Sequence, residues 1–134
     1  MTRSNTAENP GGGDPTRLGS LELQVMELLW AGGEATVEQL RNALPGVPAY
    51  TTIATVLTNL RRKKLVTRRK DGHASLHSAT MSHEEYTARV VDRALDASGN
   101  REAVMLHFVN RMGDDDVALL QEFLRARETG AESP

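Results

Sequence analysis

Three stretches in the first half of the chain repeat apolar residues at the spacing of an amphipathic helix. The first runs from about Ser20 to Trp30 and is followed by the helix-stopping pair Gly32–Gly33. The second starts at Thr36, which makes a capping-box pattern with Gln39. The third runs from Tyr50 to Lys64, after a turn rich in proline and glycine. Three short helices, the last two joined by a tight connector, predict a helix-turn-helix.

The third helix has two different faces. Apolar residues at i, i+3, i+4 and i+7 form its buried stripe: Ile53, Val56, Leu57 and Leu60. The opposite face carries Thr51, Thr52, Thr55, Thr58 and Asn59. Threonine loses side-chain freedom in a helix, whereas short side chains with a methyl group and a hydrogen-bonding atom suit base edges in the DNA major groove. We therefore interpret this segment as a recognition helix that contacts bases through Thr51, Thr52, Thr55 and Asn59.

A β-hairpin is predicted directly after the recognition helix. The segments Leu65–Lys70 and His73–His77 are separated by Asp71-Gly72, a strong signal for a two-residue type I′ turn. A hairpin that follows three such helices is a wing. Because its first strand is basic, the wing is placed to reach phosphates or the neighbouring minor groove.

The charge of the chain is distributed unevenly. The whole sequence has a net charge of −2, but residues 41–81 hold eight basic residues and one acidic residue. Such a segment is the footprint expected for a polyanion site, and the alternative is an ordinary solvated face. The threonine face beside it favours DNA. The expected phosphate-contacting residues are Arg61, Arg62, Lys63, Lys64, Arg68, Arg69 and Lys70.

The last third of the chain predicts three more helices. Ser82 and Glu85 cap a helix that runs to about Leu95, residues 103–112 form a helix that is apolar almost all round, and Asp114–Asp116 start the last helix. Three short helices cannot bury this much apolar surface alone, so we expect a second copy of the chain to cover it. The alternative is packing onto the chain's own N-terminal domain. The expected dimer interface comprises Val104, Met105, Phe108, Val109, Met112, Leu120, Phe123 and Leu124.

These patterns together predict a mainly α protein, in which a winged helix-turn-helix precedes a three-helix dimerisation domain. The expected organisation is a disordered arm (1–17), a winged-helix domain (18–81), a dimerisation domain (82–128) and a disordered tail (129–134). The chain has no cysteine, which excludes disulfides and thiolate chemistry. No apolar run reaches the roughly 18 residues of a membrane span, and the N-terminus lacks a signal-peptide core. We therefore expect a soluble cytoplasmic protein.

Other chemistry is weakly supported. His73, His77 and His83 lie within eleven residues and offer a Zn²⁺ alternative, but no acid is placed among them. We interpret them as wing and helix-start residues, and we expect no metal, no cofactor and no enzymatic activity. The alternatives to a DNA-binding repressor are a winged-helix module that binds an acidic protein, a small metal-dependent hydrolase built on the histidines, and a repressor released by a small ligand.

The residues also resemble a known family. The segments Leu23–Trp30, Thr36–Leu40 and Tyr50–Leu60, with the basic close and the wing, are similar to the penicillinase repressors of the BlaI/MecI type over about residues 17–125. The resemblance implies a dimeric bacterial repressor of β-lactam resistance or related stress genes. Such repressors occupy an inverted-repeat operator until a membrane sensor-protease system triggers their cleavage within the dimerisation domain.

The resemblance also assigns individual residues. It implies base contacts from Thr51, Thr52, Ala54 and Thr55. Some relatives carry basic residues where this chain has Thr51 and Ala54, so methyl contacts to thymine and threonine hydrogen bonds are the implied readout. The family's cleavage point aligns with the His107–Phe108 bond, where relatives typically have Asn before the Phe.

Overall fold

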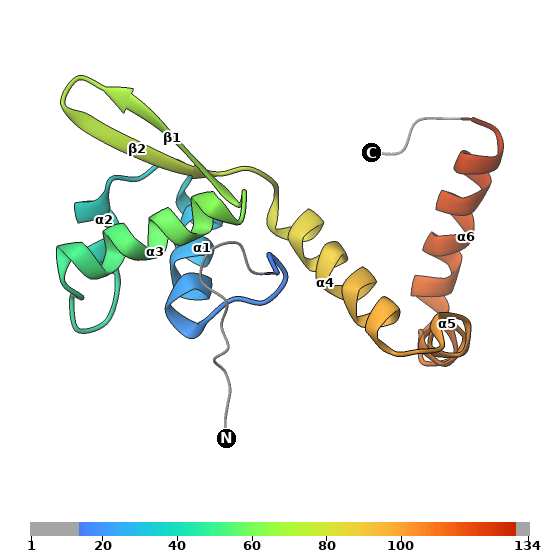
Figure 1. Ribbon diagram of the computed structural model, residues 1–134. Helices are drawn as coiled ribbons and strands as arrows, with labels where there is room; N and C mark the ends of the chain where they lie inside the picture. Colours follow the sequence, from blue (N-terminus) through green and yellow to red (C-terminus); the bar gives the residue numbers. More distant parts are fainter. Residues whose placement is uncertain (1–13, 131–134) are drawn as a thin grey trace. The chain divides into compact units, whose positions relative to one another are not determined.

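A computed structural model describes residues 14–130 (Figure 1). The elements in chain order are α1 (Ser20–Gly32), α2 (Val37–Ala43), α3 (Tyr50–Arg62), β1 (Val66–Asp71), β2 (Ala74–Ala79), α4 (His83–Ala97), α5 (Arg101–Asn110) and α6 (Asp114–Glu128). Contacts divide the chain into two compact units, one up to Val90 and one from Val91. The predicted disordered arm and tail fall on residues 1–13 and 131–134 in large part, and these lie outside the described residues.

The first unit has one closed hydrophobic core. It is built where the apolar stripes of α1, α2 and α3 meet the start of β1 and the first turns of α4. Its fully buried side chains include Val25, Met26, Leu29, Leu40, Ile53, Leu57, Leu60 and Leu65. The stripe predicted for α3 is therefore buried at three positions, while Val56 packs against the core and is half-buried. Helical spacing alone predicted this face because 3.6 residues per turn bring those positions to one side.

Side-chain caps fix the starts of α2 and α4. The hydroxyl of Thr36 accepts a hydrogen bond from the Gln39 backbone N–H at 3.1 Å, and the side-chain oxygen Oε1 of Gln39 accepts one from the Thr36 backbone N–H at 2.8 Å. This is the capping box that the sequence predicted. The hydroxyl of Ser82 likewise accepts from the Glu85 N–H at 3.0 Å and starts α4. Helix α1 continues two residues beyond the predicted end and stops at Gly33, where φ is 83°.

The hairpin forms, but its turn lies one residue later than predicted. Asp71 pairs with Ala74, so the loop is Gly72-His73 rather than Asp71-Gly72. Of these two residues only Gly72 has a positive φ, at 66°, which is the pattern of a type II′ turn and not of type I′. The register is held from outside the hairpin, because His77 of β2 exchanges two backbone hydrogen bonds with Ala35 at 2.8 and 2.9 Å. A local turn pattern contains no information about that distant contact.

The second unit contains the end of α4 with α5 and α6, and neither α5 nor α6 has a buried residue. Side-chain hydrogen bonds hold the junction between α4 and α5. The side chain of Asn100 accepts from the Ala103 N–H at 3.1 Å, and Arg101 donates to both Asp92 and Asp96 at 2.7 Å. Three aspartates open α6, as predicted from its dipole. No helix between residues 14 and 130 is long and apolar enough to span a bilayer.

Candidate nucleic-acid interface

The polar face of α3 turns away from the core of the first unit. Thr51, Thr52 and Thr55 are exposed, and Ala54 and Asn59 are half-buried. The hydroxyl of Thr58 is committed to the helix itself, because it donates to the Ala54 carbonyl at 3.0 Å and accepts from Arg61 at 3.3 Å. The exposed threonines thus occupy the N-terminal half of α3. In the C-terminal half of the same face, the polar side chains are hydrogen-bonded to other residues of the helix.

The start of α3 is held by a residue that the sequence analysis did not single out. Arg41 of α2 donates from Nε to the Pro48 carbonyl at 2.7 Å and from Nη1 to the Glu38 carboxylate at 2.8 Å. Pro48 immediately precedes Ala49, the N-cap of α3. Arg41 therefore fixes the connector between α2 and α3. The Glu38–Arg41 spacing of i, i+3 was the available sequence signal, but nothing in it indicated the bond to Pro48.

The end of α3 is held by Lys63. Its ammonium donates to Glu22 of α1 at 3.0 Å and to the Arg17 carbonyl at 3.2 Å. Both side chains of the ion pair are largely buried, at 11% exposed for Lys63 and 14% for Glu22. Lys63 was expected at a DNA phosphate, and in this structure its charge is already compensated inside the first unit.

Lys64 ends α3 in an uncommon backbone conformation. Its φ is +66°, in the left-handed region that favours glycine. The Leu65 N–H donates to the Leu60 carbonyl and the Lys64 N–H to the Arg61 carbonyl, both at 2.9 Å, so the helix closes in a Schellman motif. Leu65 then enters the core. The side chain of Lys64 is exposed at the junction between α3 and the wing.

The three basic residues of β1 have two different environments. Arg69 makes a bidentate ion pair with Glu34, with Nε at 2.5 Å and Nη2 at 2.8 Å from the carboxylate oxygens. The hydrogen bond from Arg69 lowers the pKa of Glu34, and the same bond raises the pKa of Arg69. Arg68 and Lys70 alternate with Arg69 along the strand and so point to the other face. Both are exposed, and no ion pair of either is found in the part of the chain that the structure describes.

A buried histidine lies beneath this basic surface. His77 is 3% exposed, and its ring Nδ1 lies 3.4 Å from the Ala35 carbonyl. Burial lowers the pKa of His77, and the charges of Arg61 and Arg68 lower it further. Burial and the nearby Arg68 also lower the pKa of Arg61. Burial and the charges of the two arginines therefore act in the same direction, against protonation of the imidazole.

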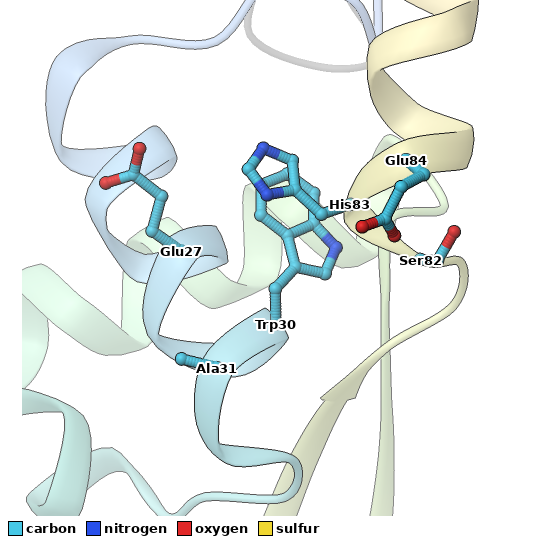
Figure 2. Close-up of a pocket in the computed structure, with 6 residues that line it drawn as sticks. All are labelled: Glu27, Trp30, Ala31, Ser82, His83 and Glu84. Atoms are coloured by element: carbon cyan, nitrogen blue, oxygen red, sulfur yellow. The ribbon is translucent and has the colours of Figure 1, made fainter.

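The other two histidines of the predicted cluster lie elsewhere. His73 is exposed in the wing turn, and His83 stacks on Trp30 with ring centroids 4.3 Å apart and planes within 3° (Figure 2). Trp30 is half-buried and donates from its indole N–H to the Met81 carbonyl at 3.1 Å, so it anchors the start of α4 to α1. Figure 2 shows Glu27 and Glu84 flanking this stack in a pocket of acidic character. Within residues 14–130 no three metal-binding side chains gather.

The seven predicted phosphate contacts thus fall into three groups. Lys64, Arg68 and Lys70 are exposed on or beside the wing. Arg61 and Arg62 donate to α3's own Thr58 and Asn59, the latter at 3.0 Å. Lys63 and Arg69 are held in ion pairs with acidic residues of the α1 region. Sequence reasoning grouped the seven by charge and could not separate them, because the acidic partners lie 35 or more positions away.

The chain is similar in sequence to known transcriptional regulators. The model of the penicillinase repressor family matches residues 18–126. The transcriptional regulator BlaI of Mycobacterium tuberculosis (strain CDC 1551 / Oshkosh) is 39% identical over 121 residues, covering 86% of this chain and 88% of that protein. The BlaI of strain ATCC 25618 / H37Rv matches with the same identity and coverage. The solution structure of the DNA-binding domain of the repressor BlaI is 20% identical, covers 55% of this chain and 92% of that one, and has a TM-score of 0.48.

Proposed function

The chain belongs to the penicillinase repressor family, and from that premise we propose that it represses transcription by binding an inverted-repeat operator as a homodimer. The family match confirms the winged-helix fold and the resemblance predicted from the sequence, and it makes the chain a BlaI-like transcriptional regulator rather than an enzyme. The operator, the dimer and the mode of induction are the proposed parts.

One observation carries the DNA-binding role: the unit that exposes a threonine face on α3 also exposes the cations Lys64, Arg68 and Lys70 at the end of that helix and on the wing. Thr51, Thr52 and Thr55 present methyl and hydroxyl groups, which read thymine methyls and base-edge donors or acceptors. Ala54 and Asn59 complete the proposed base-contacting set at its half-buried margin. Lys64, Arg68 and Lys70 supply the phosphate contacts that set register and orientation, with Arg61 and Arg62 beside them.

The dimer is proposed on the apolar surface of α5 and α6. Large apolar side chains are exposed there, including Met105 at 46%, Phe108 at 53% and Phe123 at 45%. An exposed apolar surface of this kind marks an interaction site. A second copy that covers this surface would give a dimer with two recognition helices. A two-fold operator requires such a pair, because its two half-sites lie roughly 34 Å or a multiple of that distance apart. The proposed interface also includes Val104, Val109, Met112, Leu120 and Leu124.

The regulated genes and the inducer follow from the family premise. We propose control of β-lactam resistance or related stress genes in the bacterial cytoplasm, at the nucleoid. A membrane sensor-protease system would inactivate the repressor by cutting the His107–Phe108 bond in α5. Cleavage there would remove Phe108 from its helix and break the dimer. Incubation with the activated cognate protease, followed by mass measurement, tests this step, and a chain left intact contradicts it.

Footprinting across the promoter beside the protein's own gene tests the main proposal. We expect two protected half-sites related by an inverted repeat, with protection that resists random-sequence competitor DNA. Sedimentation velocity on the same preparation should give the mass of two chains. A single protected half-site, or a monomer that still protects both, contradicts the dimeric mode of repression. Absence of sequence-selective protection contradicts operator binding at this promoter.

A further inference from the structure

The Glu34–Arg69 ion pair joins the wing to a distant part of the chain. Glu34 lies between α1 and α2, next to Ala35, which is hydrogen-bonded to His77 on the outer edge of β2. Arg69 lies on β1, which pairs with the other edge of β2. The Glu34 carboxylate therefore reaches across β2 and accepts two hydrogen bonds from one guanidinium. Such bidentate pairs fix geometry as well as charge.

Neither attraction to phosphates nor stabilisation of the fold explains why an acidic residue, Glu34, lies beside the basic wing. A carboxylate beside a basic wing repels the phosphates of DNA. Glu34 therefore opposes binding unless its carboxylate has a second effect that favours binding. The ion pair is also solvent-exposed, with 56% of Arg69 and 40% of Glu34 accessible, and exposed pairs add little to global stability. What the pair does provide is a side-chain link between β1 of the hairpin and the segment between α1 and α2.

The consequence falls on the neighbours of Arg69. Arg68 and Lys70 occupy the opposite face of β1, so fixing Arg69 also fixes where those two cations point. A wing held in advance loses less conformational freedom on binding, and that saving appears as affinity.

We propose that Glu34 is a positioning residue for DNA binding: through Arg69 it holds the wing so that Arg68 and Lys70 meet the phosphate backbone, while Arg69 itself contacts no phosphate. The proposal rests on the DNA-binding function proposed above. In this arrangement the acidic residue Glu34 increases the affinity for DNA, and Arg69 orients the wing instead of binding a phosphate.

The test compares Glu34→Gln, Arg69→Gln, the double variant, and the reversed pair Glu34→Arg with Arg69→Glu. The matched control is Glu85→Gln, which removes the same charge from an exposed ion pair with Arg89 on α4. Binding is measured on the footprinted promoter duplex and on a random-sequence duplex of equal length over a series of salt concentrations. Thermal melting of each variant confirms that it is folded.

We expect Glu34→Gln to weaken promoter binding by about three- to tenfold although it removes a negative charge, and the double variant to be no worse than either single one. Arg69→Gln should leave the salt dependence unchanged, and the reversed pair should recover affinity. Glu85→Gln should bind like wild type.

Three results would overturn the proposal: tighter binding by Glu34→Gln, a salt slope reduced by about one in Arg69→Gln, or a reversed pair as weak as the single variants. The first two would make Arg69 a phosphate contact that Glu34 merely attenuates. If the wild-type protein itself shows no salt-dependent binding to either duplex, the proposed DNA-binding function fails as well, and this result is distinct from the other three.

Discussion

The two units of this chain use their apolar residues in opposite ways. In the first unit the large apolar side chains of three helices converge on one core, with Met26, Ile53 and Leu60 fully buried. In the second unit the helix α5, which carries apolar residues on nearly every side, has no buried residue, and Leu106 is 62% exposed. The first unit buries most of its large apolar side chains in its own core, whereas the second leaves most of those of α5 and α6 exposed. Burial therefore distinguishes a surface built for folding from one available for association.

The largest effect is expected from a charge placed in the exposed apolar surface of the second unit. Phe108→Asp would have to bury a carboxylate at the proposed interface, which disfavours association. A dimer that becomes monomeric loses its bivalent grip on the operator, so we expect promoter affinity to fall by about 10²- to 10⁴-fold. Sedimentation velocity and gel shift measure the two losses.

The same variant should leave the first unit unchanged. At a protein concentration low enough for the wild type to be monomeric as well, the winged-helix unit of the variant is expected to melt at the wild-type temperature. Glu128→Gln, at the end of α6, serves as the control and should remain dimeric. A Phe108→Asp protein that sediments as wild type would place the interface elsewhere.

Within the first unit, base readout and phosphate contact can be separated. Arg68→Ala should weaken binding to every sequence and reduce the salt slope by about one. Thr55→Val should instead reduce the preference for operator over random DNA by about 1–3 kcal/mol, since it removes a hydrogen-bonding group from the face proposed to read bases. Titrations on both duplexes at several salt concentrations measure this difference. Equal losses on both sequences from both variants would contradict the two assignments.

A smaller effect is expected at the left-handed residue that ends α3. Lys64→Gly should stabilise the first unit by about 1 kcal/mol, because glycine adopts a positive φ without the steric cost that lysine pays. The same change removes an exposed cation, so DNA binding should weaken while the melting temperature rises. Lys64→Ala is the matched control, since it loses the charge and keeps the strain. A melting temperature that does not rise in the glycine variant would show that the strain is negligible.

The smallest expected effect is the pH dependence due to His77. Its folded-state pKa lies below the ordinary value of about 6.5, mainly because the ring is buried, so folding favours the neutral form. The stability that this contributes is complete above the unfolded pKa and is lost as pH falls through the folded one. Denaturant titrations from pH 7.5 to 5 should show a steeper loss for wild type than for His77→Gln. Parallel curves would mean that other groups cause the loss.

Much of the first unit was predictable because its information is local. The apolar stripe of α3, the Thr36–Gln39 capping box and the existence of the hairpin all follow from spacings of a few residues, and the structure confirms each of them. The hairpin turn was misplaced by one residue because the register depends on the bridge between His77 and Ala35. The roles of Arg41, Lys63 and Arg69 were not resolved for the same reason, since their partners are chosen by the tertiary fold.

The sequence by itself determined the elements of this protein, the polar face of α3 and the concentration of positive charge near it. Periodicity and turn chemistry encode these features within one or two turns of chain. Only the tertiary structure decided which cations are already held in ion pairs, because Glu22 and Glu34 come from segments that are remote from Lys63 and Arg69 in sequence. Opposite charges attract according to their separation in space, and that separation exists only after the core has closed.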